Sequence, residues 1–370
     1  MNAPLAPQAR TVEIEDLDRF AELVAGGATS MRGWHFQSVD LRESSAALVQ
    51  LRAAGAIFMG CSFARGIEEL LRGRGALIFP ALEHLPFNAY RGHLYTGAEL
   101  FAGIATAEYQ DVPDSSIYQW SLQARPSLHS TLATAMHDHA ITDALDDFLA
   151  KQSAPMVGVM GGHAAGRGTD AYAQAAQLGR ALTHAGFLVA TGGGPGAMEA
   201  ANLGAYLSTY DAGTLESALL TLAAVPGFQP SVTDWARAGM SVVERYPDGA
   251  QTLGIPTWFY GHEPPNVFAS AIAKYFTNAL REAILLDRSR GGIVFLPGAA
   301  GTVQEVFQDA CENYYAAEGA VAPMVLVGRH YWNVEVPVLP LLQPLAKGRI
   351  MADFVHVVDT VEEACQVLTG

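Results

Sequence analysis

The most constraining feature of this sequence is an alternation of patterns that begins after Pro155. Apolar runs of strand length recur there, separated by segments in which apolar residues have helical spacing; the runs are MVGVM, FLVAT, IPTWFY, GIVFLP, PMVLVG and FVHVV. Strands that alternate with helices predict a mainly parallel sheet with helices on both faces. Continuous apolar runs are typical of strands buried on both sides. We therefore expect a Rossmann-like, doubly wound α/β domain over residues 151–370.

Residues 1–150 have a different pattern. From about Thr11 to Trp120, short apolar runs are interrupted by Gly and Pro, which favours short strands joined by turns. The runs that begin at Gly55 and Gly75 start alike, which indicates a weak duplication, but two copies do not establish a solenoid. The stretch 125–152 has helical spacing and leads into the next domain. We expect an additional α+β domain over residues 1–150, with no role assigned from its sequence.

Composition bounds the classes of protein that remain. A chain of 370 residues can build two cores, and 50% hydrophobic with 16% charged residues describes packed globular domains. The 22 basic and 37 acidic residues give a net charge of -15, which excludes a broad basic face for nucleic acid. An anionic ligand must therefore be held by local groups.

The cysteines and the apolar runs bear on the compartment. Three cysteines are too few and too odd in number for a disulfide framework. The start, MNAPLAPQAR, lacks the basic residues and apolar run of a secretion signal, and no apolar stretch reaches the roughly 18 to 20 residues that span a bilayer. We expect a soluble, cytoplasmic protein with no membrane partner.

Glycine-rich turns follow three of the predicted strands, at 161–166, 192–199 and 297–305. In a parallel sheet the ligand lies beyond the carboxyl ends of the strands, where these turns fall. Glycine lets backbone amides approach a phosphate, and a helix start adds a positive dipole end. Any single cluster could be only a tight turn that needs positive φ, but three together predict a phosphate or nucleotide site. The residues predicted to bind it are Gly161, Gly162, His163, Gly192, Gly193, Gly194, Gly196, Met198, Glu199, Pro297, Gly298, Ala299, Ala300, Gly301 and Thr302.

A dinucleotide site is the alternative for the middle turn. Gly192, Gly194 and Ala197 fit the G-x-G-x-x-A pattern of nicotinamide and flavin enzymes. However, the pattern follows the second strand of the domain where the fingerprint follows the first, and Asp211, the nearest suitable acid, has a loop-like context. We therefore expect no organic cofactor, and no metal.

Two charged residues are candidates for chemistry. Glu305 stands four residues after Gly301, so a helix that begins near Thr302 places its carboxylate beside the glycine turn. A structural alternative exists, because Thr302 and Glu305 also fit a capping box. Arg281 falls on a helix predicted over about 266–286, just before the strand that ends at Pro297. We expect Arg281 and Glu305 to meet at the site.

The sequence GGGPGAMEAAN, followed much later by PGxxGTxxE, resembles the Lonely Guy (LOG) family of nucleoside 5'-monophosphate phosphoribohydrolases, in its long form with an extra N-terminal domain. The resemblance covers about residue 155 to the carboxyl end. It implies a Rossmann-like fold and hydrolysis of the N-glycosidic bond of AMP-like nucleotides, with cytokinin ribotides among the candidates. It also implies a homodimer or higher homo-oligomer.

The family's functional residues carry over by motif. The resemblance assigns Glu305 to the ribose side of the scissile bond and makes Arg281, within FTNALRE, the essential arginine, which stabilises the departing base or anchors the phosphate. Three departures stand out: Ala299 replaces a glycine that could need positive φ, Glu282 follows Arg281 where the family has lysine, and His163 replaces a small hydroxyl residue.

Several alternatives stay open. A nucleotide sensor without turnover is the rival to an enzyme, since Ala299 departs from the motif although Arg281 and Glu305 are present. The insertion at about 210–249 could be a lid, a packing arm or a partner surface. The run 137–139, His-Asp-His, invites a metal site, but residues two apart point to different sides of a helix, so we expect a solvated polar face. The remaining candidates for substrate contact are Tyr260, His262 and Glu263.

Overall fold

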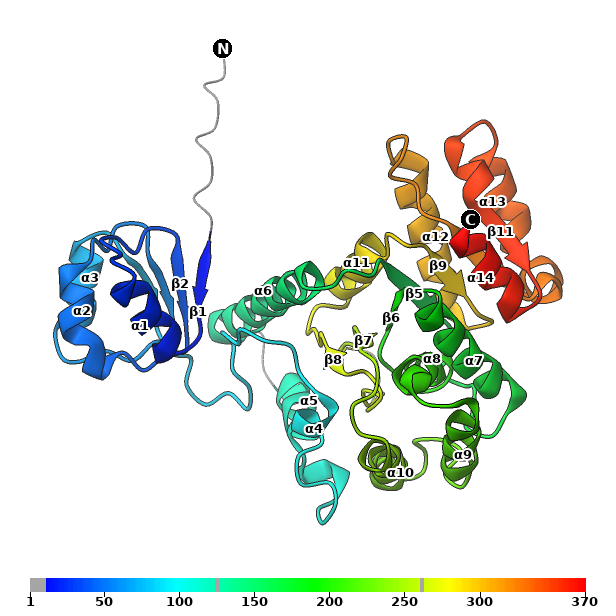
Figure 1. Ribbon diagram of the computed structural model, residues 1–370, viewed down its shortest axis with the longest axis horizontal. Coiled ribbons are helices and arrows are strands. Elements are labelled where there is room, and N and C mark those ends of the chain that lie inside the picture. Colours follow the sequence, from blue (N-terminus) through cyan, green and yellow to red (C-terminus); the bar gives the residue numbers. More distant parts are fainter. Residues whose placement is uncertain (1–10, 124–126, 260–262) are drawn as a thin grey trace. The chain divides into compact units, whose positions relative to one another are not determined.

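The computed structural model describes residues 11–123, 127–259 and 263–370, drawn in Figure 1. The chain divides into two compact units. The first is formed by residues up to His93 together with the segment that ends at Ala144, and the second by 94–123 and 145–370. The boundary near residue 150 stays a prediction; by its contacts, the segment 94–123 joins the second unit.

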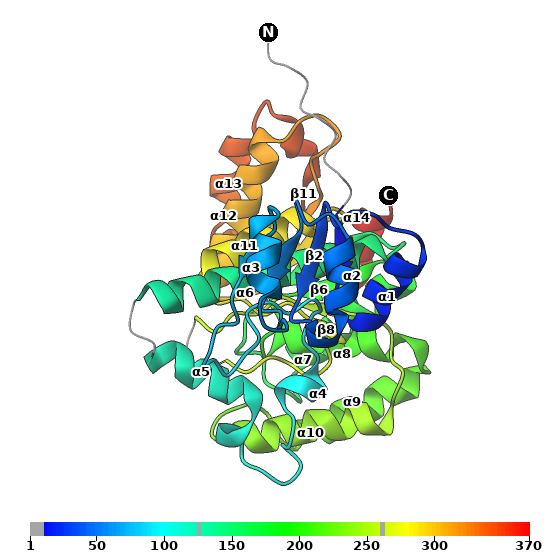
Figure 2. The same ribbon diagram turned by 90° about the vertical axis from the view of Figure 1, so that its left-hand side faces the viewer.

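The first unit contains a four-stranded sheet in the order β1-β2-β3-β4, and every pairing in it is parallel. Its strands are β1 (Val12–Ile14), β2 (Trp34–Gln37), β3 (Ile57–Met59) and β4 (Leu77–Phe79). The helices α1 (Leu17–Ala25), α2 (Ser45–Gln50) and α3 (Ile67–Gly73) connect them and lie side by side on one face of the sheet (Figures 1 and 2). The helix α6 (Leu128–Ala150), as far as Ala144, completes the unit.

Each of the strands β2, β3 and β4, with the helix and the turn that precede it, forms one coil, and the coils stack in chain order. The amide of Gly33 donates to the carbonyl of Gly55 (2.9 Å), and the amide of Gly55 donates to that of Gly75 (3.2 Å). All three glycines have positive φ, so each coil makes the same turn before its strand. Parallel strands that follow one another in the chain, each paired only with the strands beside it, form a solenoid arrangement. The duplication expected at Gly55 and Gly75 therefore extends back to Gly33. It is not evident there in the sequence, because Trp34 follows Gly33 where Ala follows the other two glycines.

Alternation along these strands separates a core face from a second face. Phe36 and Phe58 stack with ring centroids 4.4 Å apart, and the edge of Phe20 from α1 packs on Phe36. Ile78 continues this core into β4, and all four side chains are buried. The intervening residues of each strand point away from the core.

The expected solvated face on α6 is wrong for two of its three residues. His137 is fully buried and Asp138 is 2% exposed, and the ring of Phe87 lies 5.2 Å from that of His137. His139 is exposed and points elsewhere, as the helical period requires. Within the described ranges, no group of three or more His, Cys, Asp or Glu side chains is placed to hold a metal ion.

The second unit is built on a seven-stranded parallel sheet in the order β11-β10-β9-β5-β6-β7-β8. The first strand, β5, lies at the centre, with β6 on one side and β9 on the other, so the strand order reverses there. The fold class is confirmed as Rossmann-like α/β with an additional N-terminal part. The strands are β5 (Met156–Met160), β6 (Leu188–Thr191), β7 (Leu253–Gly254), β8 (Ala271–Ile272), β9 (Ile293–Phe295), β10 (Met324–Val327) and β11 (Val355–Val358).

Helices flank this sheet (Figure 1). Two of them precede its first strand in the chain, the last follows its last strand, and the others lie in the connections between strands. They are α4 (Gly97–Leu100), α5 (Pro113–Gln123), α7 (Asp170–His184), α8 (Ala197–Tyr206), α9 (Ala212–Ala223), α10 (Val232–Arg245), α11 (Asn278–Arg288), α12 (Ala300–Tyr315), α13 (Leu339–Ala346) and α14 (Val361–Thr369).

The predicted helix over about 266–286 is wrong in its first half. Strand β8 lies inside it, and α11 begins only at Asn278. Asn266 is fully buried, and its side-chain oxygen accepts from the amides of Phe268 (3.2 Å) and Ala269 (3.1 Å), which shapes a turn. Pairing of Ala271 with Leu253 at the sheet edge then prevails over the helical spacing of small residues.

A buried carboxylate ties the segment 94–123 to the sheet. Asp114 accepts hydrogen bonds from the Lys274 ammonium (2.6 Å) and the Trp258 indole (3.0 Å) on one oxygen, and from the Tyr109 hydroxyl (2.6 Å) on the other. Burial lowers the pKa of Lys274, while Asp114 opposes that shift. Because both charges are hydrogen-bonded, the pair is tolerated in the interior.

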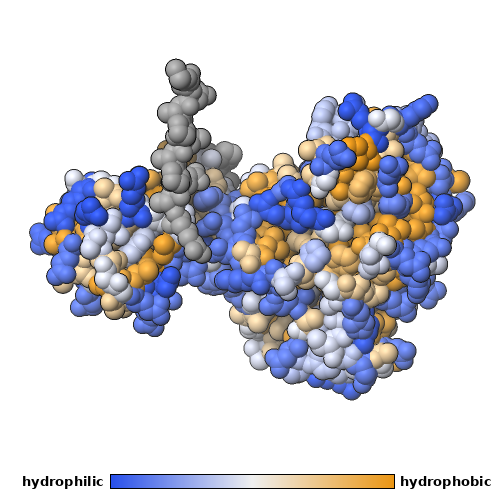
Figure 3. Space-filling view, turned by 45° about the horizontal axis from the view of Figure 1, so that its top comes forward, coloured by the Kyte–Doolittle hydropathy of each residue, from blue (hydrophilic) through white to orange (hydrophobic). Residues whose placement is uncertain are grey.

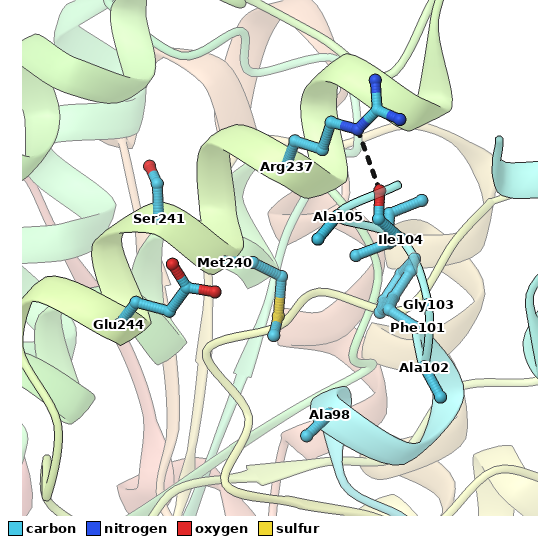
Figure 4. Close-up of a pocket in the computed structure, with 10 residues that line it drawn as sticks. All are labelled: Ala98, Phe101, Ala102, Gly103, Ile104, Ala105, Arg237, Met240, Ser241 and Glu244. Carbon is cyan, nitrogen blue, oxygen red and sulfur yellow. Dashed lines mark hydrogen bonds between the residues drawn. The ribbon is translucent and has the colours of Figure 1, made fainter. Parts of the chain in front are cut away.

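The insertion at about 210–249 is a packing arm. It forms α9 and α10, which pack on each other. From α10, the Thr233 hydroxyl accepts from the Tyr109 amide (2.9 Å), and Arg237 donates to the carbonyls of Ile104 (2.9 Å) and Ala107 (3.0 Å). Figure 4 shows the Arg237 bond to Ile104 at the edge of a cavity of about 330 Å³ between α10 and the loop after α4.

The surface in Figure 3 is hydrophilic over much of both units, with apolar patches between the polar residues. No helix in the described part of the chain is long and apolar enough to cross a membrane.

The burial of Asp309 on α12 leads to a prediction about how the free energy of unfolding changes with pH. Asp309 is 4% exposed, its Oδ2 has no hydrogen-bond partner among the described residues, and burial raises its pKa well above the ordinary value of 3.8. A raised folded-state pKa means that stability is greatest below the unfolded-state value and falls as the pH rises through the folded-state value. We expect Asp309→Asn to stabilise the protein near neutral pH but not in acid. Urea unfolding across the pH range, with the exposed Asp353→Asn as control, measures this; equal stability at all pH values contradicts it.

Candidate functional site

The three predicted glycine turns meet at the carboxyl edge of the larger sheet, where the strand order reverses. The amide of Gly162, after β5, donates to the carbonyl of Pro297, after β9 (3.3 Å). The amide of Ala197, which begins α8 after β6, donates to the carbonyl of Gly162 (3.1 Å). Backbone hydrogen bonds therefore hold the turns against one another at the position where open α/β sheets bind ligands.

Arg281 is the charged centre of this edge. From α11, its Nε donates to the carbonyl of Ile255 after β7 (2.7 Å), and its Nη2 donates to the carbonyl of Gly192 after β6 (3.4 Å). Its Nη1 lies 3.2 Å from Oε1 of Glu305 on α12. A Cβ on Gly192 would clash with Nη2 of Arg281, so a side chain there would displace the guanidinium from this position. The structure thus brings Arg281 and Glu305 together.

Glu305 is a nearly buried carboxyl group, 9% exposed. Burial raises its pKa, Arg281 lowers it, and Glu282 raises it again, with burial as the largest cause. Glu282 accepts hydrogen bonds from Asn278 (2.7 Å) and Gln304 (2.8 Å), so both of its oxygens are occupied. The replacement of the family's lysine by Glu282 therefore places a second, satisfied carboxylate beside Glu305.

The helix that carries Glu305 begins earlier than expected. α12 starts at Ala300, and its N-cap, Ala299, makes no side-chain cap, so the structural alternative, a capping box of Thr302 and Glu305, does not form. Thr302 instead packs against Gly298. Ala299 has φ -89°, so this position does not need glycine. The start of α12 is exposed from Ala299 to Gly301, and the first amides of a helix have no partner within it.

The turn after β6 is buried, unlike the turn after β9. Gly193 and Gly194 are held by Asn266, whose amide donates to the carbonyl of Gly193 (2.8 Å) and whose side chain donates to that of Gly194 (3.2 Å). Met198 packs over the same turn, close to Gly192 and Gly194. This turn therefore positions Arg281, whereas the exposed backbone amides of the site are those at the start of α12.

Glu199 is the predicted binding residue that does not reach this edge. It is 1% exposed, and its carboxylate is paired with Arg167, whose Nε donates to it at 3.1 Å. The guanidinium of Arg167 stacks 4.8 Å from the centre of the Trp235 ring, and both charged groups lie in the interior. Glu199 therefore fixes the first turn of α8 to Arg167 in the interior of the domain.

His163 and Glu263 form a partly exposed pair near these turns. Nδ1 of His163 lies 3.3 Å from Oε1 of Glu263, and the side chains are 51% and 33% exposed. Glu263 also lies near Gly194. Of the other candidates from the sequence, Tyr260 and His262 lie outside the described residues.

Two residues at this edge were missed from the sequence. Asn266 follows two prolines, and nothing in that pattern indicates that its amide clamps the turn after β6. Tyr331 donates its hydroxyl to the carbonyl of Gly298 (2.5 Å) from the segment after β10. A search for polar residues after every strand, including β10, would have found Tyr331.

These observations define a Rossmann-like domain with a polar site at its topological switch point. Residues 154–214 match the model of the SLOG cluster4 family (LDcluster4). The predicted resemblance to the LOG family is confirmed over that segment, and the match supports a nucleotide-related or ligand-binding role.

Two solved structures are similar to part of this chain. The molybdenum cofactor binding protein from Rippkaea orientalis is 18% identical, with a TM-score of 0.36; the match covers 58% of this chain and 95% of that protein. The molybdenum cofactor carrier protein from Chlamydomonas reinhardtii is 20% identical, with a TM-score of 0.35, over 59% of this chain and 99% of that one. No curated protein matches the sequence.

Gly196 is the site glycine most sensitive to a side chain. Its φ is 76° and ψ is -133°, and a Cβ there would lie 2.6 Å from the backbone of Gly162 and His163. We expect Gly196→Ala to cost more than about 2 kcal/mol, because it adds backbone strain and a backbone clash. Gly301→Ala is the matched control: it is helical with nothing within 4 Å of its Cβ, so it should gain roughly 0.5–1 kcal/mol. Urea unfolding compares them, and equal effects would contradict the expectation.

Proposed function

We propose that the second unit hydrolyses the N-glycosidic bond of nucleoside 5'-monophosphates, releasing the free base and ribose 5-phosphate. The observation that carries the proposal is the buried Arg281–Glu305 pair, 3.2 Å apart, beside the start of α12. The LOG-type resemblance over 154–214 agrees with such a substrate. We further propose that the enzyme works as a homodimer or larger homo-oligomer, as the resemblance implies.

The 5'-phosphate would bind at the exposed start of α12. This helix spans Ala300–Tyr315, long enough to have a substantial dipole, and its first amides are free of helical partners. Pro297, Ala299 and Gly301 are exposed there. Because the chain carries a net charge of -15, an anion requires local amides and a dipole of this kind rather than a basic surface.

Glu305 would act on the ribose. Cleavage of the bond between C1' and the base nitrogen passes through an oxocarbenium-like ribose, which a nearby carboxylate stabilises. The oxygen of a water molecule then bonds to C1', and the electrons of the broken bond leave with the base. One proton of that water passes to Glu305 and from there to the base nitrogen. Arg281 lowers the pKa of the buried Glu305 and so favours the ionised form. We also assign to Arg281 the stabilisation of negative charge on the departing base.

Glu305→Gln tests the chemistry with little change in shape. We expect kcat to fall by about 10²- to 10⁴-fold, because the amide cannot stabilise positive charge or accept the proton. The assay incubates purified protein with AMP, CMP, GMP and UMP and measures base and ribose 5-phosphate by chromatography. Glu318→Gln, an exposed change beyond α12, serves as control. Wild-type activity in Glu305→Gln, with its fold verified by circular dichroism, would remove Glu305 from the mechanism.

The pH profile gives an independent test of Glu305. Burial raises its pKa above the ordinary value of 4.5, and the mechanism needs the ionised form. Activity should therefore decline, as the pH is lowered, at a higher pH than an exposed glutamate would give. The acid limb of kcat/KM measures this after correction for the substrate phosphate, whose second pKa is about 6, because the profile reports groups of the free enzyme and the free substrate. An acid limb at or below 4.5, over a range where the protein remains folded, is the contrary result.

A nucleotide-binding sensor is the second candidate, and one observation favours it. The Arg281 guanidinium is already bonded to Ile255, Gly192 and Glu305, so the pair is satisfied without a ligand. Calorimetry with AMP distinguishes the two functions. Saturable binding with no base released over hours selects the sensor, whereas turnover selects the hydrolase.

A further inference from the structure

The first unit carries a second polar site, on the face of its sheet opposite the aromatic core. Register places the residues of this face in two rows across the strands. One row runs from Glu13 through His35 and Ile57 to Leu77, and the other from Gln37 through Met59 to Phe79. One end of each row is therefore polar and the other is apolar.

One face of α6 completes a cavity over these rows. Met136, His139, Ala140 and Asp143 are spaced by three, one and three residues, so they lie on one side of the helix. Together with Tyr90 and the sheet residues other than Glu13, they line a cavity of about 210 Å³. All of these residues belong to the first unit. The volume is below that of sites for drug-sized ligands, which suits a molecule built on a single ring.

Gln37 shows what the cavity accepts. It is 5% exposed and lines the cavity, and its Oε1 has no hydrogen-bond partner among the described residues. Its Nε2 donates to Glu13 (2.9 Å), and the other oxygen of Glu13 lies 3.2 Å from Nδ1 of His35. A flipped amide would set its oxygen against the Glu13 carboxylate, so Oε1 is held as an acceptor. A buried acceptor without a donor is costly, and a ligand N–H would satisfy it.

The carboxylates at the cavity make it unfavourable for an anion. Asp143 lines the cavity and Glu13 lies beside it, whereas no lysine or arginine is among the lining residues. His35 is partly buried, and that burial lowers its pKa, which favours the neutral ring. Met59, Phe79 and Met136 supply a polarisable apolar wall that suits a flat ring.

We propose that this cavity binds a small, uncharged ring compound that donates an N–H hydrogen bond to Oε1 of Gln37 and packs its ring against Met59 and Phe79. The ligand class is a single-ring amide or N–H heterocycle. All residues of this site belong to the first unit, and the site does not depend on the proposed hydrolysis.

An isosteric series of probes tests the proposal on the full chain. Benzamide, acetophenone and benzoate share one shape but carry an N–H donor, a methyl group and a negative charge, respectively. We expect benzamide to bind saturably in ligand-observed NMR at millimolar concentration, with acetophenone about tenfold weaker, as one hydrogen bond implies. Benzoate should not bind. Equal binding of benzamide and acetophenone would overturn N–H recognition, and binding of none would overturn the cavity as a ligand site.

Variants place the binding at this cavity. Gln37→Met keeps the length of the side chain but removes the acceptor, so the preference for benzamide over acetophenone should vanish. Ala140→Leu fills the cavity from α6 and should abolish binding of both, whereas Ala135→Leu, the same change on an exposed position of α6, should leave it intact. Unchanged binding in Ala140→Leu contradicts the location. If neither the wild type nor Gln37→Met binds a probe and Gln37→Met is the more stable protein, Oε1 of Gln37 is an unsatisfied or water-bonded acceptor, and the proposed ligand site is wrong.

Discussion

One guanidinium organises the carboxyl edge of the larger sheet. Arg281, from α11, bonds to the carbonyl after β6, to the carbonyl after β7 and to Glu305 on α12, so three separate connections share one rigid, always charged group. Glycine at position 192 is what lets the guanidinium approach. The buried turn after β6 and the open start of α12 are therefore parts of one arrangement. Backbone carbonyls hold the guanidinium in place, and the guanidinium in turn holds the carboxylate of Glu305.

Much of the larger unit follows from local pattern. Runs such as MVGVM and GIVFLP are apolar throughout because their strands are covered on both faces, and that property alone predicts a parallel sheet with helices around it. Once the sheet is assumed, the carboxyl ends of its strands must share an edge. The positions of the glycine turns and the expected meeting of Arg281 with Glu305 come from this rule, and the resemblance to the LOG family adds the chemistry.

The remainder depends on contacts between residues distant in the chain. Glu199 follows a glycine turn as a binding residue would, but Arg167 draws it into the interior. The segment that forms β8 has helical spacing, yet an open sheet edge pairs with it. His137 and Asp138 are polar in sequence and buried in the fold. In each case the deciding partner lies outside the local window, which is why spacing and composition could not identify it.

The stacked coils of the first unit have a consequence for its evolution. Each coil bonds only to its neighbours, so the gain or loss of one coil would leave the geometry of the others nearly unchanged. The cavity, however, extends over three adjacent strands, β2, β3 and β4, so its extent depends on how many strands, spaced about 4.8 Å apart, lie beneath it. A relative with one coil more or fewer would thus differ by a discrete step in the size of molecule it admits, with no change to any existing side chain.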